Sequence, residues 1–271
     1  ASILTTDTSL DVDNGAGALV TDIEKVGVGA TLTSGTNFSG GDNFDAGTND
    51  VSLSILAKVS SITSNNGPLI QKMSYDALNS DTGYGLLLNI NGTAYARFGD
   101  GIGNALNTTG SKNILDNKWH HFVVVFDRDA NMQVYIDGYP DGSPVNISAL
   151  NGNINASHHF GINGYSDWEG TSWYTYQNFT VKDARIYIAA GANWSAANVL
   201  TQATNPHNNA VGGTNTSSWY FDDAATAANA DADGMITDNT STNHLDAVGG
   251  TTTNYGTHSR TQQAFMSRNL I

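Results

Sequence analysis

The feature that most constrains the fold is the segment 117–138, which predicts two antiparallel strands joined by a tight turn. Residues 119–126, WHHFVVVF, are apolar on both faces, which is typical of a strand covered on both sides. Residues 127–131, DRDAN, are rich in side chains that hydrogen-bond their own backbone in turns. In 132–137 apolar and polar residues alternate, as in a strand with one buried face. Such a hairpin belongs in the centre of a β-sandwich.

Further runs have the period and composition of strands. Residues 51–59 alternate with one apolar face, 84–90 end in an Asn-Gly hairpin signal, and 179–188 form the last strong strand. Short strands separated by turn signals indicate an all-β fold. One short helix is predicted at 194–201, with Ser195 as its cap. We therefore predict an antiparallel β-sandwich of jelly-roll type with one short helix and an irregular C-terminal extension.

The composition changes after about residue 204. Residues 205–217 are linker-like, 219–222 read as a short strand, and 250–271 show little periodicity. We predict a sandwich over 1–204 and an extension over 205–271 that adds edge strands to the same sandwich and ends in an extended tail. The alternative is that the strand near 219 begins another unit.

Charge and composition exclude several classes of function. The net charge is -14, from 11 basic and 25 acidic residues, and nucleic-acid affinity depends mainly on Lys and Arg at phosphates. We therefore predict no nucleic-acid partner. No apolar run of 18 residues exists, so we predict no insertion into a membrane. The absence of cysteine excludes a disulfide framework, a thiol nucleophile and a zinc-cysteine site.

Taken together, the segments resemble the laminin-G-like, concanavalin-A-like lectin/glucanase jelly-roll family over about residues 36–201. The segments that carry the resemblance are 51–59, 68–72, 83–86, 119–127 with 134–138, 183–187 and 195–199. The resemblance implies the sandwich fold. It leaves the function open, because members bind glycans or proteins, serve as accessory domains, or build assemblies.

The stretch 165–177, YSDWEGTSWYTYQ, holds five aromatic residues and two carboxylates in thirteen positions without a regular period. Flat amphipathic rings match the apolar faces of sugars, and carboxylates accept hydrogen bonds from sugar hydroxyls. The predicted ligand-binding residues are Tyr165, Asp167, Trp168, Glu169, Trp173, Tyr174, Tyr176 and Gln177. The alternative is that the rings pack over one end of the sandwich or make a subunit contact.

Calcium is the predicted cofactor. The family resemblance implies a site at Asp183 together with a glycine turn at Asp42, although Asp183 can instead be solvated or pair with Arg185. Residues 229–240 resemble an EF-hand-type loop, but Thr240 stands where a bidentate Glu is expected, and turn chemistry alone explains its Asp-Gly. The predicted metal ligands are Asp183, Asp42, Asp231, Asp233 and Asp238.

No catalytic residue is predicted. Sandwich glycosidases need two carboxylates projecting from one face of a strand, which acidic residues at positions i, i+2 and i+4 would supply. No predicted strand carries acidic residues at that spacing. Polysaccharide lyases of this architecture need a Tyr and a His beside an Arg or Gln. Tyr95, Arg97 and His121 can be combined that way, but no motif supports the combination.

We therefore predict a non-catalytic, extracellular, glycan-binding (lectin-like) or adhesion module. Its partner is a glycan or cell-surface polysaccharide, and its location is extracellular or on a particle surface. One alternative is a structural, decoration or fibre component of a virion or other surface assembly, with further subunits of that assembly as partners. The second alternative is a polysaccharide lyase or glycoside hydrolase.

Overall fold

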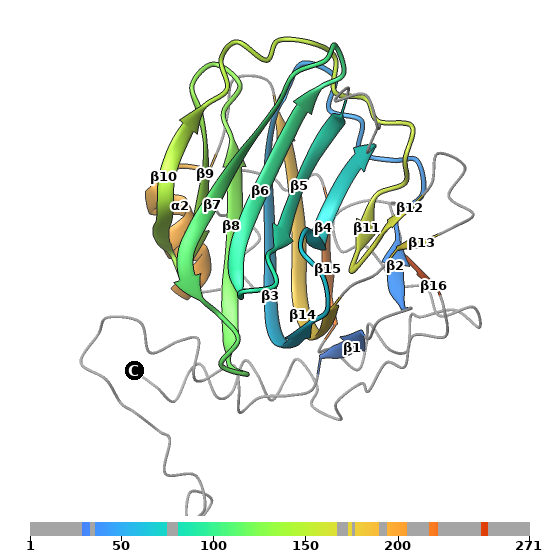
Figure 1. Ribbon diagram of the computed structural model, residues 1–271, viewed down its shortest axis with the longest axis vertical. Coiled ribbons are helices and arrows are strands. Elements are labelled where there is room, and N and C mark those ends of the chain that lie inside the picture. The colour runs from blue at the N-terminus through green and yellow to red at the C-terminus, as the bar shows by residue number, and fades with distance from the viewer. Residues whose placement is uncertain are drawn as a thin grey trace, which may run out of the picture.

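A computed structural model describes most of the central part of the chain (Figure 1). The described residues are 29–32, 36–74, 81–166, 173–174, 177–189, 194–204, 217–221 and 245–248. They form two seven-stranded sheets, a two-stranded ribbon and one helix, and all strand pairs are antiparallel. The predicted all-β sandwich with one short helix is confirmed.

The first sheet has the long strand β14 near one edge. Its order is β1 (Ala30–Leu32), β14 (Gln177–Ala189), β3 (Asp50–Ile62), β8 (Trp119–Phe126), β9 (Asn131–Ile136) and β10 (Tyr139–Asn146), and β15 (Ser217–Tyr220) also pairs with β14. β1 pairs with the first half of β14 and β15 with the second half. The two short strands therefore share one edge of the first sheet.

The second sheet packs against the first and encloses the core. Its order is β16 (Asp246–Val248), β2 (Asn37–Ser39), β11 (Gly161–Ile162), β4 (Gly67–Ser74), β5 (Thr82–Leu88), β6 (Thr93–Asp100) and β7 (Ala105–Asn113). The ribbon is β12 (Tyr165–Ser166) with β13 (Trp173–Tyr174), and the helix is α2 (Ala196–Thr204). No helix among the described residues is long and apolar enough to cross a membrane.

The predicted central hairpin is β8 and β9. β8 lies between β3 and β9, and every residue in it is buried. Phe122, Val124 and Phe126 point into the main core between the sheets. Val123 and Val125 point the other way and pack against α2 and the residues before it. The strand is apolar on both faces because the opposite sheet covers one face and α2 covers the other.

α2 begins two residues later than the sequence predicts and continues to Thr204. Ser195 caps it as predicted, since its hydroxyl oxygen accepts a hydrogen bond from the Asn198 amide at 3.2 Å. Trp194 precedes the helix because its ring is buried on the sheet, stacked 6.2 Å from the ring of Tyr187. Figure 1 shows α2 on the outer side of β8, β9 and β10. The helix thus covers part of the outer face of the first sheet.

The C-terminal region contributes a strand to each sheet, β15 to the first and β16 to the second. Trp219 of β15 is fully buried, with its ring 5.6 Å from Phe44 and 5.4 Å from Phe160. Phe221 lies 5.2 Å from Phe38 in the same layer. These aromatic contacts join residues after 216 to the core of the sandwich.

Candidate functional site

One end of the sandwich is organised by Arg128, in the turn between β8 and β9. Its side chain is buried and donates hydrogen bonds to the carbonyl oxygens of Gly47 (2.9 Å), Leu150 (2.9 Å) and Gly152 (2.6 Å). Its guanidinium lies 5.4 Å from the ring of Phe98. One cation therefore ties its own turn to two other loops, and it points into the protein instead of toward solvent.

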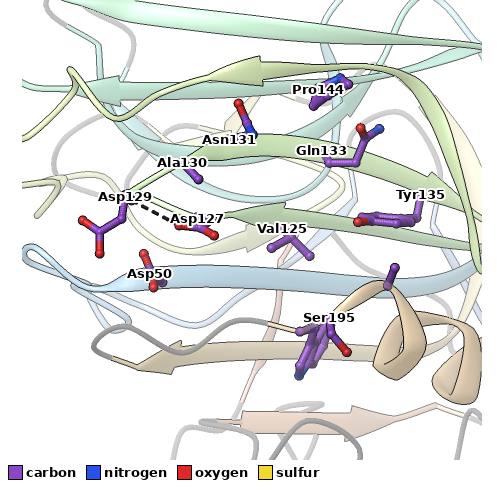
Figure 2. Close-up of a pocket in the computed structure, with 12 residues that line it drawn as sticks. Asp50, Val125, Asp127, Asp129, Ala130, Asn131, Gln133, Tyr135, Pro144 and Ser195 are labelled. Carbon is purple, nitrogen blue, oxygen red and sulfur yellow. Dashed lines mark hydrogen bonds between the residues drawn. The ribbon is translucent and has the colours of Figure 1, made fainter.

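A groove of about 670 Å³ lies between this turn, the outer face of β9 and the start of α2; we call it the acidic groove (Figure 2). Its lining residues are Asp50, Val125, Asp127, Asp129, Ala130, Asn131, Gln133, Tyr135, Pro144, Trp194, Ser195 and Ala196. Figure 2 shows Asp50, Asp127 and Asp129 gathered at one end of the groove and the Tyr135 ring at the other. The groove therefore presents carboxylates and an aromatic ring along one line.

The three carboxylates give the groove a negative character. None of the described residues that line it is a lysine or an arginine. Asp50 is buried and accepts a hydrogen bond from the Arg128 amide at 2.8 Å. Burial raises the pKa of Asp50; the Arg128 amide opposes this rise, and the negative charges of Asp127 and Asp129 add to it. A ligand that supplies hydrogen-bond donors is the natural match for this end.

Tyr135 is half-buried in the groove, so part of its ring is left for a ligand. Burial raises the pKa of its phenol, which keeps the hydroxyl protonated and able to donate. Gln133 lies nearer to it on the same face of β9, and the exposed Asn131 lies farther along the strand toward the acidic end (Figure 2). An amphipathic ring with amide and carboxylate groups farther along the same groove is suited to a molecule with apolar faces and hydroxyl edges.

A second groove, of about 740 Å³, lies beside the loop between β6 and β7; we call it the arginine groove. Its lining residues are Arg97, Gly103, Asn104, Ala105, Leu106, Asn107, Ala149 and Leu150. Arg97 forms an ion pair with the buried Asp81 and donates a hydrogen bond from Nη1 to the Tyr95 hydroxyl at 3.3 Å. Asn107 is the β7 partner of Arg97 and is exposed. This groove offers donors and apolar surface.

A family model described as the concanavalin A-like lectin/glucanases superfamily, of the laminin G type, matches residues 29–190. The chain belongs to this superfamily. The match spans both sheets apart from β15 and β16. The family assignment predicted from the sequence is confirmed.

Solved structures with distant similarity include two toxin binding domains. The binding domain of botulinum neurotoxin DC, solved in complex with SialylT, has 13% identity and a TM-score of 0.42, and the match covers 58% of this chain and 35% of that chain. The binding domain of Paraclostridial Mosquitocidal Protein 1 has 17% identity and a TM-score of 0.43, with 64% and 39% covered. This protein thus spans less than two fifths of the length of either of these two chains. A search of curated proteins found no match.

The aromatic stretch that the sequence singles out begins and ends in regular structure. Tyr165 and Ser166 form β12, which pairs with Trp173 and Tyr174 in β13. Tyr165 is half-buried, and Gln177, in β14, is fully buried and donates a hydrogen bond to the Pro68 carbonyl oxygen. Gln177 therefore ties the end of the stretch to β4. The other four predicted ligand-binding residues, Asp167, Trp168, Glu169 and Tyr176, lie outside the described residues, and ligand binding by this stretch stays a prediction.

The predicted calcium ligands fall in three places. Asp183 is buried and forms a two-pronged ion pair with Arg185, with both N–O distances 2.8 Å. Asp42 forms an ion pair with Lys72 at 2.7 Å. Across the described ranges, no three His, Cys, Asp or Glu side chains lie close enough to hold a metal. Asp183 and Asp42 are thus each paired with a cationic side chain. Asp231, Asp233 and Asp238 lie outside the described residues, so calcium binding stays a prediction.

The three residues considered for a lyase do not lie together. Tyr95 and Arg97 are on the outer face of the second sheet, and their hydroxyl and guanidinium are in contact. His121 is on the outer face of the first sheet and hydrogen-bonds to the Ser54 hydroxyl at 2.8 Å. Packed sheets are about 10 Å apart, so the sandwich core separates His121 from the other two.

The acidic groove is not apparent from the sequence. In the sequence, Asp127 and Asp129 have the pattern of turn residues, and Tyr135 is only the outward position of an alternating strand. One usable signal was present, because the outer face of β9 carries Gln133 and Tyr135 next to the acidic turn. The contribution of Trp194 and Ser195 comes from the tertiary packing of α2 and is not visible in any local pattern.

Proposed function

We propose that this protein is a non-catalytic glycan-binding, lectin-like module and that the acidic groove holds the sugar. One observation carries the proposal: a half-buried tyrosine ring and three carboxylates line a single groove at an end of the sandwich. The apolar face of one sugar unit stacks on Tyr135, and the hydroxyls of a unit farther along the chain donate to Asp127 and Asp129 at the other end of the groove. An extracellular or particle-surface location, where glycans are displayed, belongs to the same proposal.

The groove is suited to this role because its walls are held in place before a ligand arrives. The acidic turn is fixed by the buried Arg128 side chain, and the α2 wall is fixed by Trp194 packed with Val123 and Val125. A ligand therefore pays little conformational entropy to order the site.

Binding is expected to depend on Tyr135. On a glycan array and in titrations with the best glycan found, Tyr135→Ala should weaken binding about tenfold or more, since truncating a central aromatic contact costs about 2 kcal/mol. Asp129→Ala, an exposed position in the turn, should weaken binding without an effect on folding. The matched control is Tyr139→Ala on β10, a tyrosine 55% exposed and outside the groove. Wild-type affinity in both groove variants would count against the proposal.

Glycoside hydrolysis is a second candidate because of Asp50. Burial raises the pKa of this carboxyl, and it shares the groove with Asp127. A carboxyl of raised pKa that shares a groove with a second carboxyl is the usual pairing in glycosidases. An assay for new reducing ends on neutral polysaccharides decides between the two functions. The binding-module proposal expects none with the wild type, whereas release that Asp50→Asn abolishes would favour the hydrolase.

A further inference from the structure

The acidic groove and the arginine groove lie at the same end of the sandwich, on either side of the segment after β10. The carbonyl oxygen of Ala130, in the wall of the acidic groove, accepts a hydrogen bond from the Ile147 amide at 2.9 Å. Ala149, in the wall of the arginine groove, follows two residues later. Two residues span at most about 7 Å of chain. Only a short piece of backbone therefore separates the grooves.

The loop between β6 and β7 meets the same segment. A Cβ placed on Gly152 would lie 2.2 Å from the Asp100 carbonyl oxygen, and one placed on Gly101 would lie 3.3 Å from the Asn153 carbonyl oxygen. Figure 1 shows the segments that follow β6, β8 and β10 at one end of the molecule. The two grooves thus lie on the outer faces of the two sheets and approach each other over this end of the sandwich.

Arg128 fixes the relation between the two grooves. Its amide donates to Asp50 in the acidic groove at 2.8 Å, and its Nη2 donates to the Leu150 carbonyl in the arginine groove at 2.9 Å. The residue is buried, so solvent does not compete for these bonds. The spacing between the grooves is therefore built into the core of this end.

The two grooves have complementary hydrogen-bonding characters. The acidic groove supplies acceptors from Asp127 and Asp129. The arginine groove supplies donors from Arg97 and Asn107, with apolar surface from Leu106, and the ion pair with Asp81 offsets the positive charge of Arg97. The hydroxyl groups of a sugar chain can donate hydrogen bonds in the acidic groove and accept them in the arginine groove. An anionic chain would instead be repelled by the three carboxylates of the acidic groove.

We infer that the ligand is an extended, neutral polysaccharide chain that crosses this end of the sandwich and occupies both grooves at once. The inference rests on the proposed function and adds the arginine groove as a second binding site. Once one groove holds the chain, occupation of the other is intramolecular, and such linkage raises affinity by about 10²–10⁴-fold when the geometry permits both contacts. Affinity should therefore increase with chain length until both grooves are filled.

The test is a length series. Neutral gluco-, manno- and galacto-oligosaccharides of two to about eight units are titrated against the wild type, Asn107→Ala and Tyr135→Ala. For the series that binds, affinity should increase roughly a hundredfold or more with length. Asn107→Ala should reduce the affinity for long chains about tenfold and leave the affinity for the shortest unchanged, while Tyr135→Ala should weaken both. The control Thr109→Ala is exposed on the same face of β7, two residues from Asn107 and outside the groove.

Each failure has a distinct meaning. Equal affinity at every length, or wild-type binding of long chains by Asn107→Ala, overturns the two-groove inference while the glycan-binding function stands through Tyr135. Tighter binding of sulfated or uronic-acid oligosaccharides overturns the neutral-chain assignment. If no oligosaccharide binds at any length, the inference is wrong, and the glycan array decides separately whether the proposed function fails with it.

Discussion

Acidification from pH 6.5 to 4.5 is expected to lower the free energy of unfolding by roughly 2 kcal/mol through one residue, His121. His121 is buried in β8, and its Nε2 atom lies 2.8 Å from the Ser54 hydroxyl. Burial, assisted by the positive charge of Arg185 and opposed by Asp137, lowers the pKa of His121 to about 3. An unfolded histidine has a pKa of about 6.5. Between these values the unfolded chain binds one proton more than the folded protein, so stability falls as the pH falls.

The neighbouring titratable groups do not titrate in this window. The pKa of His120 is lowered by burial but raised overall by Asp137 at 2.8 Å and Asp116 at 3.1 Å. Its contribution is therefore complete below about pH 6.5 and is lost as the pH rises through its folded pKa. Burial alone would raise the pKa of Asp137, but its contacts with His120 and Lys112 lower this pKa to about 2. The stability from Asp137 is complete above about pH 3.9 and is lost only below it.

Urea unfolding at pH 6.5 and 4.5 measures this effect. The wild type should lose roughly 2 kcal/mol, and His121→Gln, which has no titrating group at this position, should lose much less. His159→Gln, a half-buried histidine before β11, is the control and should behave like the wild type. The same pH dependence in His121→Gln and the wild type would show that His121 is not held neutral in the folded protein.

Replacing Trp219 with alanine is expected to lower the free energy of unfolding by about 3–5 kcal/mol, the usual cost of removing a buried Trp side chain. The ring is fully buried between Phe44 and Phe160, and its strand pairs with β14. This loss is a large fraction of the stability of a typical domain, about 5–15 kcal/mol. The C-terminal strands therefore should unfold together with the sandwich.

Denaturant unfolding of Trp219→Ala, followed by circular dichroism, tests this. Leu200→Ala on α2 is the control, because that side chain is 38% exposed and its loss should cost less than about 1 kcal/mol. A Trp219→Ala protein that unfolds with the wild-type midpoint would mean that β15 is not a stabilising part of the sandwich.

The fold was predictable wherever local pattern and burial agree. The β8–β9 hairpin is recognisable because β9 has one buried face and β8 has two. The start of α2 was less predictable: Trp194 fits the apolar period of a helix but packs on Tyr187 instead. For Asp183 the sequence left three options open, namely a metal ligand, a solvated carboxylate or a partner for Arg185. The ion pair with Arg185 depends on a side-chain contact that no local pattern reveals.

The acidic groove was not predictable because its residues come from three distant segments. Asp50 begins β3, the acidic turn follows β8, and Trp194 precedes α2. The pairing of β3 with β8 brings Asp50 beside the acidic turn, and the packing of α2 on the first sheet brings Trp194 to them. The aromatic stretch had a stronger local signal because its residues are contiguous, and it stays a candidate for contacts beyond the acidic groove.

The proposed function depends on a neutral glycan bound in the acidic groove. Isothermal titration of the best array glycan against wild type, Tyr135→Ala and Tyr139→Ala, each with its folding verified by circular dichroism, tests it most directly. The dissociation constant should be about tenfold or more higher for Tyr135→Ala and unchanged for Tyr139→Ala. Equal dissociation constants for all three proteins would contradict the proposed function.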